Sequence, residues 1–139
     1  VQVEVGDQCS EFEHLPHDVQ FQRCERYFQV IARVADDTSS SLHYIATGAL
    51  YQADQVLGVA HFQTTMRTNP SITVTSGSNY YAFSRNNAAD YFDNLIGYGM
   101  SPRNCLIYQD NSNISGTAGH GGAIWCNNAS ASITASAEL

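Results

Sequence analysis

The sequence contains no lysine and few charged residues of any kind. Charged residues make up 14% of the 139 residues, against roughly one quarter in an ordinary globular domain. All six basic residues are arginines, and the formal net charge is −7, so we expect no basic face and no nucleic-acid partner. Ser, Thr, Asn, Gln and Tyr must therefore cover the surface. Such a surface is typical of an extracellular or virion protein, and equally of a chain that is largely buried between subunits.

Long apolar runs and catalytic signatures are missing as well. No stretch approaches the length that spans a bilayer, so we expect no membrane insertion. The sequence has no G-x-S-x-G elbow and no H-E-x-x-H pair, and its glycine-rich tract does not lead from a strand into a helix. Asp36 and Asp37 are adjacent, which would direct them to opposite sides of an extended chain. The sequence therefore predicts neither an enzyme nor a cofactor.

The cysteines and histidines lack the spacing of a metal site. Cys9, Cys24, Cys105 and Cys126 form no C-x-x-C pair, and the five histidines are scattered. We expect free and mostly buried thiols, and no metal. If one disulfide does form, Cys105 with Cys126 is the better pair, because both lie in strand-like runs that could be neighbours.

The length and the pattern of short alternating runs predict a single β-rich unit. Residues 1–26 are expected to form an N-terminal strand, a loop and a short helix, and residues 27–139 a β-sandwich domain. The turn residues divide the chain into about eight to ten short strands. The expected fold is all-β, an antiparallel β-sandwich of jelly-roll type with one short N-terminal helix.

The pattern of apolar residues changes from helix-like to strand-like within the stretch Cys24–Val34. Asp18 can cap a helix that ends near Arg26, and Phe21 and Cys24 are the candidates for its sheet-facing side. From Tyr27 onward the pattern alternates. The apolar set is Phe28, Val30, Ala32 and Val34, and we expect it to be buried. The other set is Tyr27, Gln29, Ile31 and Arg33, and we expect it to face water or a subunit.

The remaining strands are expected between clusters of turn residues. The first should cover Val1–Val5, and Pro70 marks the entry of a strand or a sheet edge. The last should place Ile133, Ala135 and Ala137 on one face. The other predicted strands cover residues 42–51 and 55–64 as a long hairpin, then 72–75, 80–84, 92–98, 105–109, 123–126 and 131–139, with a loop at 86–90.

Several motifs resemble a segment of bacteriophage tail-fibre and structural proteins. The matching stretches are 1–6, 12–14, 24–28, 66–71 and 135–139, against the family patterns V-Q-x-E-x-G, F-E-H, C-Q-R-Y-F, M-R-A-x-P-T and A-D-A-E-L. Pro16, His17 and Ser136 depart from the family pattern. The residues that carry the resemblance as a structural motif are Cys24, Arg26, Tyr27, Phe28, Met66, Arg67, Pro70, Glu138 and Leu139.

The resemblance implies a function and a location. It implies a non-enzymatic structural protein of the phage virion, a tail-fibre or spike module that forms a homotrimer and contacts other virion proteins. Family members usually carry more sequence before this segment, so the chain is expected to be a piece of a longer protein. A capsid decoration or head-fibre protein is one alternative. A secreted, lectin-like sugar-binding domain is the alternative of another class.

Aromatic residues beside Asn, Ser and Gly loops are the candidate contacts for a host receptor or surface glycan, since rigid rings and adaptable polar groups suit recognition. The alternative is that half of them belong to the core or to a subunit interface. The candidates are Tyr80, Tyr81, Tyr91, Tyr108 and Trp125, with Tyr98 as a further exposed ring.

Two arginines of the shared motifs need partners if they lie beside buried strands, because an unpaired buried charge costs several kcal/mol. These arginines are Arg26 and Arg67. Glu138 or the terminal carboxylate of Leu139 is the expected partner.

Overall fold

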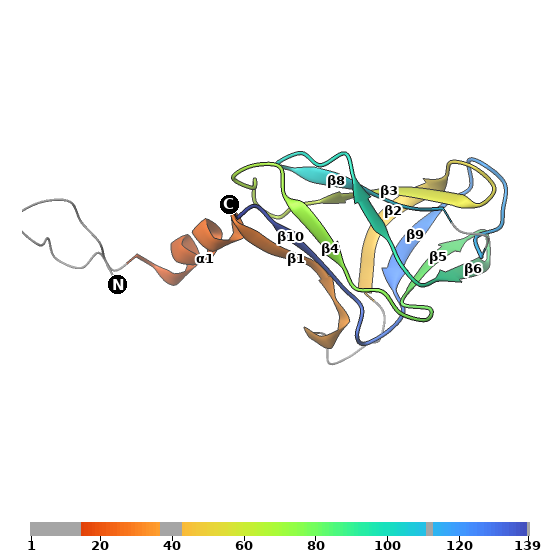
Figure 1. Cartoon of the computed structure of the whole chain (residues 1–139), viewed down its shortest axis with the longest axis horizontal. Helices are drawn as coiled ribbons and strands as arrows, with labels where there is room; N and C mark the ends of the chain where they lie inside the picture. Colours follow the sequence, from red (N-terminus) through yellow and green to blue (C-terminus); the bar gives the residue numbers. More distant parts are fainter. Residues whose placement is uncertain (1–14, 37–42, 111–112, 139) are drawn as a thin grey trace, which may run out of the picture.

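The computed structural model describes residues 15–36, 43–110 and 113–138 (Figure 1). In these ranges one α-helix, one 3-10 turn and ten strands occur. They are α1 (His17–Glu25), β1 (Phe28–Arg33), η1 (Val34–Asp36), β2 (His43–Leu50), β3 (Gln55–His61), β4 (Ser71–Val74), β5 (Tyr81–Arg85), β6 (Ala88–Phe92), β7 (Ile96–Tyr98), β8 (Asn104–Asp110), β9 (Gly121–Cys126) and β10 (Ser132–Ser136). The predicted strand Val1–Val5, Cys9, Asp37 and Leu139 lie outside the described residues.

The strands form two antiparallel sheets. The smaller has the order β1-β10-β4, and the larger has the order β6-β5-β9-β2-β3-β8-β7. The pairing is nested: β1 pairs with β10, β2 with β9, β3 with β8 and β5 with β6. β4 and β7 complete the series because they are in contact at the edges of the two sheets. The chain is thus one long hairpin folded over itself, which is the connectivity of a jelly roll, and the predicted fold class is confirmed.

The contact between β4 and β7 depends on a glycine. A Cβ atom built at Gly97 in β7 would lie 2.7 Å from the Cβ of Ile72 in β4. Any larger residue would therefore push the two sheets apart at this edge.

The core lies between the inward faces of the two sheets. Ala32 and Ile133 come from the smaller sheet, and the larger sheet supplies most of the remaining side chains. The predicted face of the last strand is confirmed for Ile133, Ala135 and Ala137, which are all buried. The large-sheet residues of the core are Leu50, Val56, Ala60, Tyr81, Phe83, Phe92, Cys105, Ile107, Ile124 and Cys126.

The face predicted for the first strand is wrong over half of its length. Ala32 is buried, but Phe28 and Val30 are exposed, and Gln29 is buried between them. The cause is a β-bulge: Val30 faces Thr134 and Ala32 faces the next residue, Ile133, so one extra residue reverses the alternation.

The buried Gln29 joins three parts of the chain. Its Nε2 donates to the carbonyl of Glu25 at 3.0 Å and to the carbonyl of Thr64 at 2.7 Å, and its Oε1 accepts from the backbone N–H of Gln63 at 2.9 Å. A buried amide with both ends satisfied is stable in a core, and here it fixes the end of α1 against the segment after β3.

The loop predicted at 86–90 is instead a tight hairpin. β5 and β6 pair from Tyr81 with Phe92 to Arg85 with Ala88, which leaves only Asn86 and Asn87 to turn the chain. Both asparagines have positive φ, 38° and 60°, as a type I′ turn requires. Asparagine tolerates this conformation better than other non-glycine residues. The strand predicted over 92–98 is not continuous: Phe92 is the last residue of β6, and Ile96–Tyr98 form the separate short strand β7.

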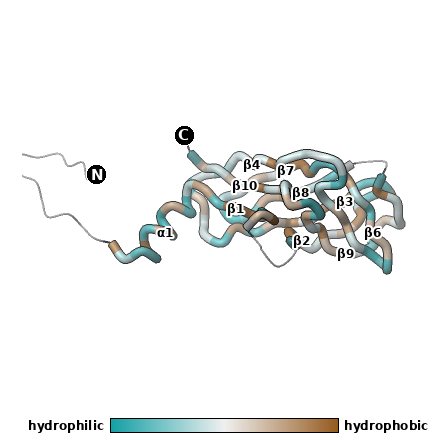
Figure 2. Tube along the Cα trace, turned by 90° about the horizontal axis from the view of Figure 1, so that it is seen from below, coloured by the Kyte–Doolittle hydropathy of each residue, from teal (hydrophilic) through white to brown (hydrophobic). Residues whose placement is uncertain are grey.

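The helix α1 extends away from the sandwich (Figure 2). None of its nine residues, all of which are described, is buried. Pro16 occupies the N-cap without a side-chain hydrogen bond, so Asp18 lies in the first turn and does not cap the helix as predicted. The prediction that Phe21 and Cys24 pack on a sheet is also wrong, since both are exposed.

Candidate functional site

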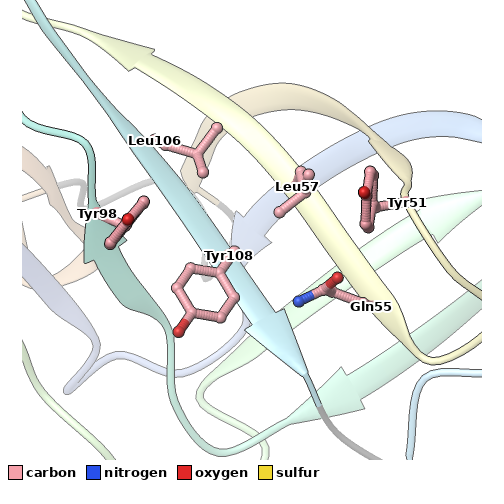
Figure 3. A pocket seen from close by; sticks show the side chains of 6 residues that line it. All are labelled: Tyr51, Gln55, Leu57, Tyr98, Leu106 and Tyr108. Atoms are coloured by element: carbon pink, nitrogen blue, oxygen red, sulfur yellow. The ribbon is translucent and has the colours of Figure 1, made fainter.

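The outer face of the large sheet carries a hollow that we call the tyrosine groove (Figure 3). It has a volume of about 280 Å³, and its walls come from the β2–β3 turn and from β3, β7 and β8. Its lining residues are Tyr51, Gln55, Leu57, Tyr98, Leu106 and Tyr108.

The strand registers explain why these side chains meet. Leu57 in β3 faces Tyr108 in β8, and Leu106 in β8 faces Tyr98 in β7. All four belong to the outward-facing set of their strands, because the residues between them, such as Val56 and Ile107, are buried. The rings of Tyr98 and Tyr108 are arranged edge to face, with centroids 6.3 Å apart. Cross-strand contact therefore holds the Tyr108 ring at one wall of the groove.

Only part of the predicted aromatic contact set lies at this site. Tyr108 lines the groove, as does Tyr98. Tyr91 is exposed elsewhere, on β6, and Tyr80 is half-buried against the core. The sequence analysis missed Tyr51 because it assigned this residue to the end of the predicted strand 42–51, whereas Tyr51 lies in the turn between β2 and β3.

Tyr81 is a core residue and not a surface contact, contrary to the prediction. Its ring packs against Phe92, and its hydroxyl donates to the carbonyl of Thr75 at 2.7 Å. Burial raises the pKa of Tyr81 to about 12, against a smaller opposing effect of the hydrogen bond with the Thr75 side chain. The hydroxyl thus ties β5 to the end of β4, across the two sheets.

Trp125 is likewise buried, which is contrary to its predicted role as a surface contact. Its Nε1 donates to the Oγ of Ser84 at 2.8 Å, and its ring meets that of Tyr91 edge to face at 6.1 Å. Since Ser84 and Trp125 lie on the paired strands β5 and β9, this contact holds one strand to the next.

A second surface, which we call the helix–strand surface, lies where α1 leads into β1. It is a hollow of about 510 Å³, and its apolar residues Phe21, Phe28 and Val30 are exposed. β1 is also an edge strand of the smaller sheet. The other lining residues are Cys24, Glu25, Gln29 and Gln63.

Three of the five stretches on which the predicted resemblance rests, 24–28, 66–71 and 135–139, meet beside this surface. The N–H of Arg67 donates to the carbonyl of Arg26 at 2.7 Å, and the N–H of Ala137 donates to the carbonyl of Tyr27 at 2.7 Å. Met66 is buried against Ala135 and Ala137. Segments that are far apart in sequence therefore form one structural unit.

The condition under which the motif arginines were expected to need an ion-pair partner, a place beside buried strands, is not met. Arg67 is exposed, and its guanidinium lies 5.7 Å from the centroid of the Tyr27 ring, a cation–π arrangement. Arg26 and Glu138 are exposed too, so no buried charge demands a partner. Leu139 is outside the described part. Pro70 directly precedes β4, an edge strand, as predicted.

An ion pair that the sequence did not indicate stabilises the β5–β6 hairpin. Nη2 of Arg85 lies 2.8 Å from Oδ2 of Asp90, and both side chains are largely shielded from solvent. Nε of Arg85 donates to the same oxygen at 3.0 Å. The guanidinium also lies against Gly116, where a Cβ atom would come within 2.8 Å of Cζ. The role of this ion pair is therefore structural, since it holds β5 and β6 together.

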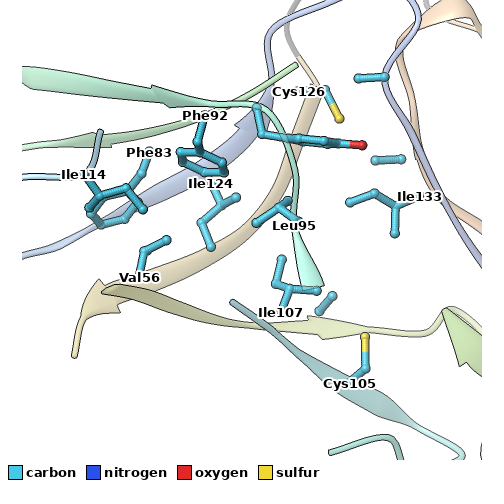
Figure 4. Close-up of a cluster of buried hydrophobic side chains, with 14 of the residues drawn as sticks. Val56, Phe83, Phe92, Leu95, Cys105, Ile107, Ile114, Ile124, Cys126 and Ile133 are labelled. Carbon is cyan, nitrogen blue, oxygen red and sulfur yellow. The ribbon is translucent and has the colours of Figure 1, made fainter. Parts of the chain in front are cut away.

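Cys105 and Cys126 are free and buried, on opposite sides of the core (Figure 4). They are not neighbours, because β2 and β3 lie between their strands β9 and β8. Three strand spacings amount to about 14 Å, which is far beyond the reach of a disulfide. Burial raises the pKa of the Cys105 thiol to about 11 and that of Cys126 to about 12.

These cysteines differ from Cys24 in a way that can be measured. We expect iodoacetamide near neutral pH to alkylate the exposed Cys24 in the native protein and to leave Cys105 and Cys126 unmodified, because the thiolate is the reactive form and burial disfavours it. Peptide mass mapping reads each site separately. Alkylation in urea is the control and should modify all three. Equal native rates at Cys24 and Cys126 would contradict the buried position of β9.

Two classes of site were also sought in the part of the chain that the structure describes. No group of three or more His, Cys, Asp or Glu residues there is arranged to hold a metal ion. No helix within those ranges is both long and apolar enough to cross a membrane.

Comparisons with family models, with curated proteins and with solved structures find no match to this chain.

Proposed function

We propose that the chain is a non-enzymatic structural module of a bacteriophage particle, a fibre or spike domain that works as a homotrimer. The observation that carries the proposal is the helix–strand surface. It presents Phe21, Phe28 and Val30 to solvent at the point where a helix without buried residues joins an edge strand.

The helix is the strongest reason to expect a partner. Isolated helices shorter than about 12 to 15 residues are marginal in water, and α1 has nine residues. Helices of proteins are normally stabilised by packing an apolar face, yet Phe21 is exposed and none of the residues of α1 is buried. Packing against another copy would supply the missing contacts.

The edge strand β1 supports the same conclusion. Exposed edges with apolar side chains tend to associate unless charges or prolines protect them. On β1 the exposed residues include Phe28 and Val30, and Arg33 is the charged residue of the strand. The absence of lysine and the low charge density of the whole sequence fit a chain that buries surface between subunits.

The phage context is supported by the motif stretches. Three of the five stretches that carry the resemblance are residues 24–28, 66–71 and 135–139, and these segments contact one another beside the helix–strand surface. Residues that serve assembly are expected to lie together beside the surface through which the copies associate, as these segments do. The threefold order comes from the resemblance to phage fibre modules.

Light scattering tests the assembly. We expect a mass near three times the 15.2 kDa of one chain at micromolar concentration. Val30→Asp should convert the trimer to monomers, because a charge would be buried in the interface. The matched control is Val59→Asp, since Val59 in β3 is 44% exposed and Val30 is 41% exposed. A parent protein that stays monomeric, or a trimer broken by Val59→Asp and not by Val30→Asp, would contradict the proposal.

The position on the particle needs a different measurement. Electron microscopy of phage labelled with an antibody to this domain should show it on a fibre or spike. Label on the capsid shell would favour the alternative, a decoration or head-fibre protein. The alternative of another class, a secreted lectin-like domain, would leave every particle unlabelled.

A further inference from the structure

We propose that the tyrosine groove binds one ring of a neutral carbohydrate on the host surface. This inference supplies the ligand class for the receptor-binding part of a fibre or spike module, and it rests on the proposed function in that respect. The groove and the helix–strand surface share no lining residue. The β2–β3 turn, which carries Tyr51, lies at the end of the molecule opposite α1 (Figure 1).

The rings of the groove are placed for stacking. Tyr51 and Tyr98 are each 65% exposed, so the core does not require them, and they come from separate elements that converge on one hollow. The edge-to-face contact with Tyr98 orients Tyr108 before any ligand arrives. Preformed aromatic walls reduce the entropy lost on binding.

The chemistry of the lining matches a sugar ring. Leu57 and Leu106 form an apolar floor, and the three phenol hydroxyls and the Gln55 amide supply donors and acceptors around it (Figure 3). A pyranose ring likewise has an apolar and a polar part, because C–H groups lie on its faces and hydroxyls on its perimeter. The Oε1 of Gln55 is 3.4 Å from Nε2 of Gln52, a contact that orients the amide.

The size and charge of the site narrow the ligand class. A volume of about 280 Å³ lies just below the range for ligand sites, about 300 to 1,000 Å³, so the groove suits a single ring with its linkages leading out to solvent. Among the described residues that line it, none is charged. Since the chain also carries a formal net charge of −7, an acidic sugar would meet no cation here and a repulsive field around it. A neutral sugar avoids both costs.

A glycan array with neutral and sialylated oligosaccharides tests the proposal, followed by titration calorimetry with the best neutral oligosaccharide. We expect binding to neutral glycans, with no gain from sialic acid. Tyr98→Ala and Tyr51→Ala should each weaken the affinity about tenfold through the loss of a stacking ring. Tyr44→Ala is the matched control, because Tyr44 is also 65% exposed but lies outside the groove, and it should leave the affinity unchanged.

The outcomes separate this inference from the assembly proposal. An array without neutral binders, a preference for sialylated glycans, or equal affinities in the Tyr98→Ala and parent proteins would overturn the carbohydrate site. A Tyr98→Ala protein of lower mass in light scattering would also overturn it, since the groove would then be a subunit contact. Sugar binding by a monomeric parent protein, lost in Tyr98→Ala, would instead contradict only the trimer.

Discussion

Removal of residues 135–139 is expected to abolish folding of the chain. β10 is the central strand of the smaller sheet, and Ala135 and Ser136 pair with both β1 and β4. The deletion would also remove the buried Ala137 and uncover Met66. Each lost backbone hydrogen bond costs about 1 kcal/mol, so the sum with the apolar burial approaches the total stability of a domain, about 5 to 15 kcal/mol. Circular dichroism should show no cooperative thermal transition.

Two control variants test whether the loss of stability comes from the removal of β10 itself. Deletion of residues 138–139 leaves the buried Ala137 in place, so the melting temperature should stay near that of the parent. Arg67→Ala should cost less than about 1 kcal/mol, because Arg67 is exposed and stacked on Tyr27. A 135–139 deletion that still melts cooperatively at the parent temperature would show that β10 does not hold the smaller sheet together.

Tyr81→Ala should destabilise the fold by about 3 to 5 kcal/mol, as is usual when a buried aromatic ring is removed. Tyr81 fills the centre of the core beside Phe92. Tyr81→Phe keeps the ring and removes only the hydroxyl that donates to Thr75, so about 1 kcal/mol is expected. Urea unfolding of the three proteins gives these differences directly.

The comparison with Tyr91 distinguishes a core role from a binding role. Tyr91 is exposed and meets Trp125 edge to face, so Tyr91→Ala should cost only about 1 kcal/mol. Equal losses of stability in Tyr81→Ala and Tyr91→Ala would contradict the buried position of Tyr81. A soluble, fully stable Tyr81→Ala protein would show that Tyr81 is a surface contact after all.

Alternation in the sequence predicted the strands well, but it did not show which face of a strand is buried. In β3 one face carries Val56, Gly58 and Ala60, and the other carries Leu57 and Val59 between Gln55 and His61, so each face contains apolar residues. The alternation does not show that Leu57 and Val59 point away from the core. Only the pairing of β3 with β8 decides that Leu57 points outward beside Tyr108. The tyrosine groove could not be predicted for this reason, since its floor consists of residues that look like core.

Local sequence was also unable to reveal the bulge in β1. The predicted apolar face holds for Ala32 and fails for Phe28 and Val30, because the extra residue in β1 appears only when the strand is paired with β10. Gln29 is buried through partners about 35 positions away, Gln63 and Thr64. The sequence predicted the architecture, whereas the helix–strand surface arises from long-range pairing.

The nested pairing of the strands has a consequence for synthesis of the protein on the ribosome. Phe28 at the start of β1 faces Ser136 at the end of β10, so the outermost strand pair requires nearly the whole chain. Until β10 has been synthesised, β1 and β4 both lack the strand that joins them, and the edge of β1 that later pairs with β10 is open as well. Folds dominated by such distant contacts form in about milliseconds to seconds. The smaller sheet therefore cannot form before residues 132–136 have been synthesised, and until then newly made chains meet one another with β1 and β4 unpaired.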